Sequence, residues 1–159
     1  MSIDLARRRF SAGLARSCAW FAALGSTALH AADETPAPDA LVQRAHGVTN
    51  GAAIRSGRVV IDTPRLADNG HSVPIVVRVE SAMTAQDFVR RIALVSESNP
   101  RPLIATFHLS AKSGRAEIAT RIRLNKTQHV MALAELSDGS FWSSRAEVIV
   151  TESACLDAD

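Results

Sequence analysis

The side chain with the clearest chemical potential is Cys155, in the run Ser153-Ala154-Cys155-Leu156-Asp157-Ala158-Asp159. A thiolate is a nucleophile and can hold a substrate group covalently. The other cysteine, Cys18, lies in an N-terminal segment that looks like an export signal. Without Cys18, an exported chain has no partner for an internal disulfide. Cys155 then either stays free for chemistry or pairs between chains, and we expect it on a flexible arm, residues 153–159.

The residues beside Cys155 set its expected reactivity. Asp157, Asp159 and the terminal carboxylate are negative, which disfavours a thiolate, raises the pKa of the thiol and repels anionic ligands. Solvent and salt weaken the rise in pKa and the repulsion on a mobile tail. Ala154 and Leu156 carry side chains, so this arm is wider and stiffer than one built from glycine. Leu156 also offers an apolar contact to a partner.

Other constellations for chemistry are weaker. Three histidines, His71, His108 and His129, are scattered over expected strands, where we expect them in the core or at the surface rather than around a metal. A blue-copper site needs His and Met ligands around a cysteine, and nothing after Cys155 supplies them. No G-x-S-x-G motif of a serine hydrolase occurs. We therefore expect no metal, no other cofactor and no catalytic residue.

A basic strand edge and an aromatic pair could serve a partner. The basic edge consists of Arg121, Arg123 and Lys126. A solvated face is the simpler interpretation, and a partner surface is the alternative. Trp142, beside Phe141, is expected in core or interface packing. No strong nucleic-acid signature remains once residues 1–31 are removed, because the formal net charge is then −1.

The N-terminus has the pattern of an export signal. Arg7, Arg8 and Phe10 form an Arg-Arg-x-Phe run, followed by an apolar stretch over 19–29. This order is typical of a cleaved signal, and the paired arginines indicate twin-arginine export to the periplasm, with a plain secretory signal as the alternative. The stretch is shorter than the roughly 20 residues of a membrane-spanning helix. We expect cleavage near Ala31 and no stable membrane insertion.

Composition fits one modest soluble domain. The chain has 159 residues, 47% hydrophobic and 21% charged, with 4% aromatic residues and no Tyr. Its core must therefore rest on Val, Ile, Leu and Ala. Removing residues 1–31 takes away four of the 18 basic and one of the 16 acidic residues, which changes the formal charge from +2 to −1.

The rest of the chain alternates strand and turn signals. Asp39 predicts the start of a short helix that ends at Gly47 and packs at one end of the fold. Residues 50–57 are turn-like. Alternating β-branched runs predict about seven strands, at 58–62, 73–80, 88–95, 103–109, 116–124, 129–136 and 141–150. We expect the fourth to pair with the fifth across Lys112-Ser113-Gly114 and the last two to form a hairpin. Together, these strands and turns predict an all-β antiparallel sandwich.

Several segments in order resemble one known family. They are Asp68-Asn69-Gly70-His71-Ser72-Val73-Pro74, Asn99-Pro100-Arg101-Pro102, Ala105-Thr106-Phe107-His108, Thr120-Arg121-Ile122-Arg123-Leu124 and Glu135-Leu136-Ser137-Asp138-Gly139-Ser140-Phe141. They resemble SoxY, the carrier subunit of the bacterial sulfur-oxidising (Sox) system. The resemblance covers about residues 39–156.

The resemblance implies an immunoglobulin-like β-sandwich that pairs with a SoxZ-like subunit as a heterodimer. It also implies that Cys155 holds a sulfur-containing intermediate while Sox-type or related periplasmic enzymes act on it. The family arm reads Gly-Gly-Cys-Gly-Gly, whereas Ser153, Ala154, Leu156 and Asp157 flank the cysteine here. This arm is similar to a variant group with Ala-Ala-Cys-Ile-Glu, which implies altered cargo or partner specificity.

The expected organisation is therefore a signal peptide over 1–31, a linker and short helix over 32–57, a SoxY-like sandwich over 58–152 and a carrier arm over 153–159. The chain is expected to be a carrier and not an enzyme. A structural or interaction module, with Cys155 in an intermolecular disulfide or idle, is the alternative.

Overall fold

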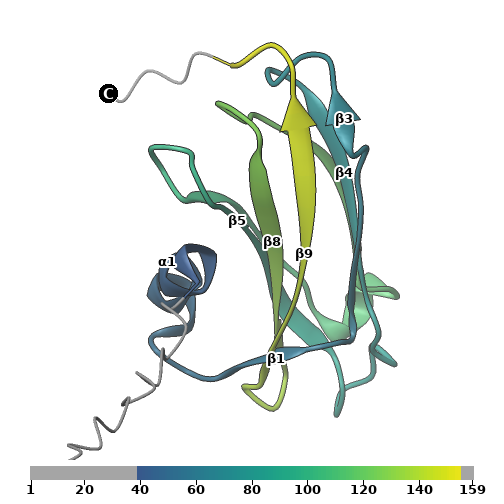
Figure 1. Ribbon diagram of the computed structural model, residues 1–159. Coiled ribbons are helices and arrows are strands. Elements are labelled where there is room, and N and C mark those ends of the chain that lie inside the picture. The colour runs from purple at the N-terminus through teal and green to yellow at the C-terminus, as the bar shows by residue number, and fades with distance from the viewer. Residues whose placement is uncertain (1–38, 155–159) are drawn as a thin grey trace, which may run out of the picture. The chain divides into compact units, whose positions relative to one another are not determined.

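The computed structural model describes residues 39–154. The expected signal peptide with Arg7, Arg8 and Phe10 lies outside the described residues, as do Cys155, Leu156 and Asp157. The described part is a two-sheet β-sandwich with one α-helix (Figure 1). The predicted immunoglobulin-like sandwich is thus confirmed.

The helix α1 spans Ala40–Thr49 and begins where the sequence predicts. Asp39 is its N-cap, and its side chain accepts a hydrogen bond from the backbone N–H of Leu41 at 3.0 Å. The helix runs past Gly47, the predicted end, to a cap at Asn50 with φ 52°. Asn tolerates this left-handed conformation, so Asn50 ends the helix as glycine often does.

The larger sheet has the order β1-β9-β8-β5-β6, with β3 pairing separately with β9, and the smaller sheet has the order β2-β4-β7. The strands are β1 (Ile54–Ser56), β2 (Val59–Asp62), β3 (Leu66–Ala67), β4 (Val73–Val79), β5 (Val89–Ser96), β6 (Leu103–His108), β7 (Glu117–Ile122), β8 (Gln128–Leu136) and β9 (Phe141–Val150).

The main core fills the space between the two sheets. Its members come from alternate positions of each strand, for example Ile75 and Val77 of β4 facing Ile92 and Leu94 of β5. This period of two is what the sequence predicts for strands with one buried face. The strand β4 shows it most clearly, with every second residue buried.

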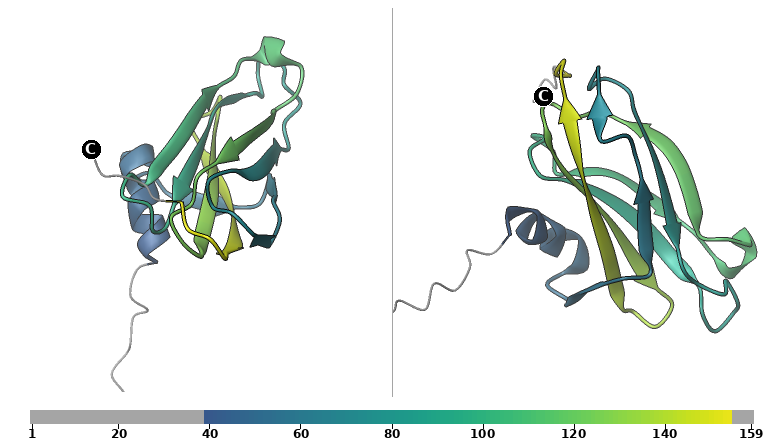
Figure 2. Two further views of the ribbon diagram at one scale, coloured as in Figure 1. Left: turned by 90° about the horizontal axis from the view of Figure 1, so that it is seen from above. Right: turned by 45° about the vertical axis from the view of Figure 1, so that its right-hand side comes forward.

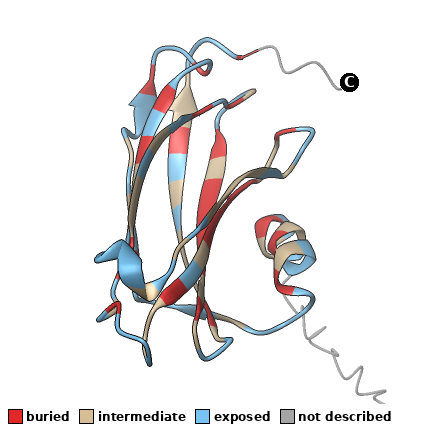
Figure 3. Ribbon diagram, turned by 180° about the vertical axis from the view of Figure 1, so that it is seen from behind, coloured by how far each residue is buried: buried red, intermediate tan, exposed pale blue. Residues whose placement is uncertain are grey.

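The strands β5 and β8 are buried on both faces, because the helix covers the outer face of the larger sheet. Leu41 and Ala45 of α1 pack on Val95 of β5 and Met131 of β8. Figures 2 and 3 show the helix beside that sheet, on the side away from the smaller sheet. The expectation that the helix packs at one end of the fold was wrong. Its apolar stripe needs an apolar surface, and the outer face of β5 and β8 provides one.

The pairing of β6 with β7 was also predicted wrongly. Observed β6 pairs with β5, and β7 pairs with β4, in different sheets. The chain crosses between the sheets through a short 3-10 helix, Ala111–Ser113. Neighbours in sequence therefore become the edge strands of opposite sheets. The hairpin of β8 and β9 across Ser137-Asp138-Gly139 is confirmed.

Two strands were missing from the prediction. The strand β1 lies within the turn-like stretch 50–57 and pairs in parallel with β9 at Phe141–Ser143. The strand β3 pairs in parallel with β9 at Ile149–Val150. Both are short, and both depend on a partner more than 80 residues away in the sequence. Local periodicity carries no signal for such pairings.

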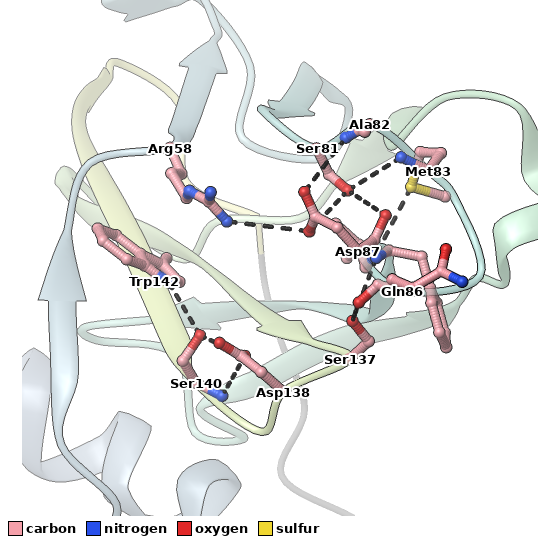
Figure 4. A network of polar contacts seen from close by, with 12 residues as sticks. Arg58, Ser81, Ala82, Met83, Gln86, Asp87, Ser137, Asp138, Ser140 and Trp142 are labelled. Atoms are coloured by element: carbon pink, nitrogen blue, oxygen red, sulfur yellow. Dashed lines mark hydrogen bonds and ion pairs between the residues drawn. The ribbon is translucent and has the colours of Figure 1, made fainter.

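Polar contacts tie loops together at the end of the sandwich that holds the β8–β9 turn (Figure 4). Asp87 pairs with Arg58 at 4.0 Å and accepts a hydrogen bond from Ser81 Oγ. The Arg58 guanidinium lies 5.4 Å from the centroid of the Trp142 ring, whose Nε1–H donates to Ser140 Oγ at 3.0 Å. Trp142 packs against the main core, as the sequence predicts.

Candidate functional site at the base of the C-terminal segment

The chain leaves β9 at the opposite end of the sandwich from the β8–β9 turn, where Figure 1 shows the end of β9 beside β3. Backbone hydrogen bonds hold this exit. The N–H of Thr151 donates to the carbonyl of Ala67 at 3.1 Å, and the Thr151 hydroxyl donates to the carbonyl of Asp68 at 2.8 Å. The N–H of Ala154 donates to the carbonyl of Leu124 at 3.2 Å. The residue directly before Cys155 is therefore attached to the body.

Gly70 holds the exit from the other side. Its N–H donates to the carbonyl of Glu152 at 2.8 Å, and its carbonyl accepts from the N–H of Leu124 at 2.9 Å. A Cβ at position 70 would collide with the carbonyl oxygen of Leu124, and would lie 3.0 Å from both Ala154 N and Val150 Cγ1. Only glycine lets the three segments approach this closely.

A buried amide network fixes the loop that carries Leu124. Gln128 Nε2 donates to Asn99 Oδ1 and to Asn125 Oδ1, both at 2.9 Å. Asn99 Nδ2 donates to the carbonyl of Arg123 at 2.8 Å. Gln128 is 3% exposed and Asn99 5%, so these bonds replace water for groups that would otherwise be costly to bury. The network makes the carbonyl of Leu124 a rigid anchor for Ala154.

A carboxylate–histidine pair borders this network. Glu97 Oε2 accepts from the backbone N–H of His129 at 2.9 Å and lies 3.0 Å from its Nδ1. The backbone hydrogen bond, followed by the side-chain one, holds the pKa of Glu97 below its ordinary value of 4.5. Since Glu97 directly precedes the loop of Ser98 and Asn99, the pair stabilises the same end of the sandwich.

Two residues of the expected arm, Ser153 and Ala154, lie in the described part of the chain, and they differ in their contacts. Ser153 is exposed, but Ala154 is 2% exposed and its N–H is bonded to the body. The expectation that Ala154 widens a free arm was therefore wrong, because its methyl group is buried against the sandwich. The residues that anchor it, Gly70, Leu124 and Asn99, were not predicted as site residues. The Asn69-Gly70 turn was recognised, but only as a turn.

The remaining candidates are dispersed. Arg121 donates to the carbonyl and hydroxyl oxygens of Ser72 at 3.4 and 3.2 Å. Within residues 39–154, no group of three or more His, Cys, Asp or Glu side chains could hold a metal ion. His129 pairs with Glu97, while His71 and His108 lie at exposed positions. In the same described range, no helix is long and apolar enough to cross a membrane.

A family model described as "Sulfur oxidation protein SoxY" matches residues 45–155 of the chain. The chain belongs to the SoxY family. The match to the SoxY model begins in α1, includes both sheets and ends at Cys155, one residue beyond the anchored Ala154. The segment whose geometry is described above is thus continuous with the last residue matched. A sequence search of curated proteins found no match.

Solved structures share the SoxY-like fold at low identity. The sulfur carrier protein SoxY from Chlorobium limicola f thiosulfatophilum is similar with a TM-score of 0.58 and 23% identity, over 70% of this chain and 96% of that one. A superoxide reductase from Ignicoccus hospitalis gives 0.53 and 17%, over 59% and 80%. One from Nanoarchaeum equitans gives 0.51 and 12%, over 60% and 100%. At these identities the similarity concerns the sandwich alone.

Proposed function

We propose that the protein is a periplasmic carrier of the SoxY type, which holds a sulfur-containing intermediate covalently on Cys155 and presents it to partner enzymes. Family membership supports carriage in sulfur oxidation. The observation that supports Cys155 in particular is the anchored exit of the chain. A backbone hydrogen bond holds Ala154 at one rim of the sandwich, so the segment with the thiol begins next to a fixed point of the fold.

The chemistry requires a thiol and an external oxidant. When the Cys155 sulfur joins a thiosulfate-like cargo, one S–S bond forms, and the thiol proton and two electrons are released. The carrier has no proposed group to take these electrons, so a partner enzyme with an electron acceptor must do so. The carrier contributes a nucleophilic sulfur on a short segment, and we propose no catalytic residue and no cofactor in this chain.

The residues after Cys155 favour a cargo or partner that differs from that of a glycine-arm carrier. Leu156 and Asp157 add bulk and charge next to the sulfur. A narrow enzyme channel that admits glycine would reject both, and specificity can arise from such clashes as well as from attractions. Ser153 and Ala154 contribute less to this filter, because Ala154 is held against the body.

We further propose that the chain is exported through its Arg7-Arg8-x-Phe10 signal and pairs with a SoxZ-like subunit as a heterodimer. The division into a signal over 1–31, a linker and helix over 32–57, a sandwich over 58–152 and an arm over 153–159 belongs to the same proposal. The helix α1 should be counted with the sandwich, because Leu41 and Ala45 pack on it.

Mass spectrometry of the native protein tests carriage directly. The protein is isolated from periplasm of cells oxidising reduced sulfur compounds, and the mass of the intact chain and of the Cys155 peptide is measured. An adduct on Cys155 that disappears in Cys155→Ser supports the carrier. A disulfide-linked dimer of double mass would instead support the structural module. A free thiol under every such growth condition would contradict carriage.

A further inference from the structure

A groove runs along one open side of the sandwich, between the edge strands of the two sheets. It has a volume of about 370 Å³ and is lined by β6 on one side, β7 on the other, and the Asn99–Arg101 loop at one end. This volume falls within the roughly 300–1,000 Å³ of ordinary ligand sites. The groove is therefore large enough for a few side chains of a peptide.

The walls of the groove are apolar and its rim is basic. The groove is lined by Leu103, Ile104, Ala105 and Ile122, and Leu103 is 47% exposed although it is a large hydrophobic residue. The arginines that line it are Arg101, Arg121 and Arg123. No acidic residue is among the lining residues. This combination suits a short segment with an apolar side chain and negative charges.

The C-terminal segment has that composition and starts at the groove. Residues 155–159 read Cys-Leu-Asp-Ala-Asp. Their last described neighbour, Ala154, is bonded to the carbonyl of Leu124, and Leu124 directly follows the groove residue Arg123. An extended chain spans about 3.3–3.6 Å per residue, so these residues reach about 17 Å from Ala154. The groove is therefore within their reach.

We propose that residues 155–159 of this chain dock in the β6–β7 groove, with Leu156 against the apolar wall and Asp157 and Asp159 beside the arginines. In the docked state Cys155 is held against the body instead of extending into solvent. A partner enzyme then has to draw the segment out before it can reach the sulfur. The docking does not depend on what Cys155 carries, although its role as a resting state of a carrier rests on the proposed function.

The Arg123 side chain is available for this pairing without loss of the fold. The network at the base of the segment uses the backbone carbonyl of Arg123, and no hydrogen bond or ion pair joins the Arg123 guanidinium to residues 39–154. Substitution of Arg123 by Gln therefore removes charge from the groove and leaves the anchor intact. Arg115, before the other end of β7, has a side chain that is 81% exposed and provides a matched control.

Disulfide trapping with Cys155 tests the docking. One variant carries Leu103→Cys in the groove, and a second carries Leu66→Cys on β3, on the other side of the chain exit. Both positions are exposed leucines, at 47% and 56%. The unloaded protein is oxidised with diamide, which takes up both thiol hydrogens. Peptide masses then show which cysteines are joined. A disulfide that involves Cys18, in protein that still carries residues 1–31, is recognised in the same way.

The ratio of the two trapping rates is the readout, because the intrinsic reactivity of Cys155 is common to both. We expect trapping at position 103 to exceed that at position 66. Exposed ion pairs are weak, so Asp157→Asn with Asp159→Asn, or high salt, should lower the ratio by about 2- to 10-fold. Arg123→Gln should lower it too, whereas Arg115→Gln should not.

Equal trapping at both positions, or a ratio unaffected by charge and salt, would overturn the docking. A disulfide between two copies of the chain, seen as a dimer of double mass, would also overturn it, because the groove would then be filled in trans. Failure of the carrier proposal alone leaves the ratio unchanged, since the assay uses no cargo and no partner enzyme.

Discussion

Cys155 takes its expected behaviour from the residues on both sides. The residue before it is anchored, while those after it contribute Leu156 and two aspartates. A sulfur that projects from a fixed point is easier to position than one on a loose tail, because less conformational entropy is lost when a partner binds it. The proposed filter for cargo then lies in the residues that follow the sulfur.

Glycine at positions 156 and 157 should therefore broaden the specificity of the carrier. We expect slow loading of the native protein by a thiosulfate-conjugating Sox enzyme, and faster loading of Leu156→Gly with Asp157→Gly. The adduct mass is measured after incubation with thiosulfate, an electron acceptor and the enzyme. Ser153→Gly should change little, and Cys155→Ser should abolish loading. If the native segment loads as fast as the glycine variant, it is no filter and thiosulfate becomes the favoured cargo.

Glu97 should make stability depend on pH in the acid range. Its pKa is lowered in the folded state, chiefly by the hydrogen bond from the His129 N–H. Folding therefore stabilises the ionised form, so this contribution is present above the ordinary pKa of 4.5 and is lost as the pH falls through the lower folded value. Urea unfolding of Glu97→Gln should show a smaller loss of stability on acidification below 4.5 than the native chain. An identical acid loss in both proteins would contradict this role.

At the scale of elements, the loop after β3 and the end of β9 form one unit. Gly70 sits between Leu124 and the segment 150–154, and its two backbone hydrogen bonds join them. The loop 97–100 supports the same unit through Asn99 and Gln128. The position of Ala154, directly before Cys155, is thus set by three segments that are distant in the sequence.

Substitution of Gly70 by Ala should disturb this unit. The added methyl group meets backbone atoms that cannot rotate away, and overpacking of this kind costs about 1–3 kcal/mol in unfolding free energy. Urea denaturation measures the cost, and faster amide exchange at Ala154 reports release of the chain exit. Gly47→Ala is the matched control, since nothing lies within 4 Å of a Cβ there. Within a helix that change should stabilise by roughly 0.5–1 kcal/mol. Equal changes in unfolding free energy at positions 70 and 47 would contradict the role of Gly70 at the chain exit.

At the scale of the whole molecule, the sandwich ends in edge strands, among them β6 in the larger sheet and β2 and β7 in the smaller one. Edge strands present unpaired backbone groups and are commonly blunted or covered. The proposed SoxZ-like subunit would cover part of these edges.

The heterodimer should form without the reactive sulfur. We expect a SoxZ-like subunit to co-purify equally with the native chain and with Cys155→Ser, because the proposed interface lies on the sandwich and does not need the thiol. Size-exclusion chromatography of the co-expressed pair provides the measurement. A clean monomer in the presence of that subunit would contradict the partner, and loss of the complex in Cys155→Ser would indicate an intermolecular disulfide instead.

Export should depend on the paired arginines. Replacement of Arg7 and Arg8 by Lys keeps the positive charge, so it leaves a general secretory signal intact but removes the twin-arginine pattern. We expect the precursor to accumulate in the cytoplasm, measured by cell fractionation and immunoblotting. Arg16→Lys, outside the pattern, should be exported normally. Unchanged periplasmic levels of the double variant would favour the secretory alternative.

The sequence by itself determined the features that depend on near neighbours. Asp39 marked the start of the helix, alternation marked β4, and Ser137-Asp138-Gly139 marked the β8–β9 hairpin. Caps, periodicity and turns act over a few residues, so their signals can be read locally. The ordered motifs also indicated the SoxY family, and the cysteine count singled out Cys155.

The tertiary structure alone decided how distant segments meet. It placed β6 and β7 at the edges of different sheets, paired β1 and β3 with β9, and laid α1 on the outer face of β5 and β8. It also brought Gly70, Leu124 and Ala154 into contact. These contacts depend on which surfaces bury one another and which backbone groups remain to be paired. These contacts are determined by several segments together, and no single stretch of sequence encodes them.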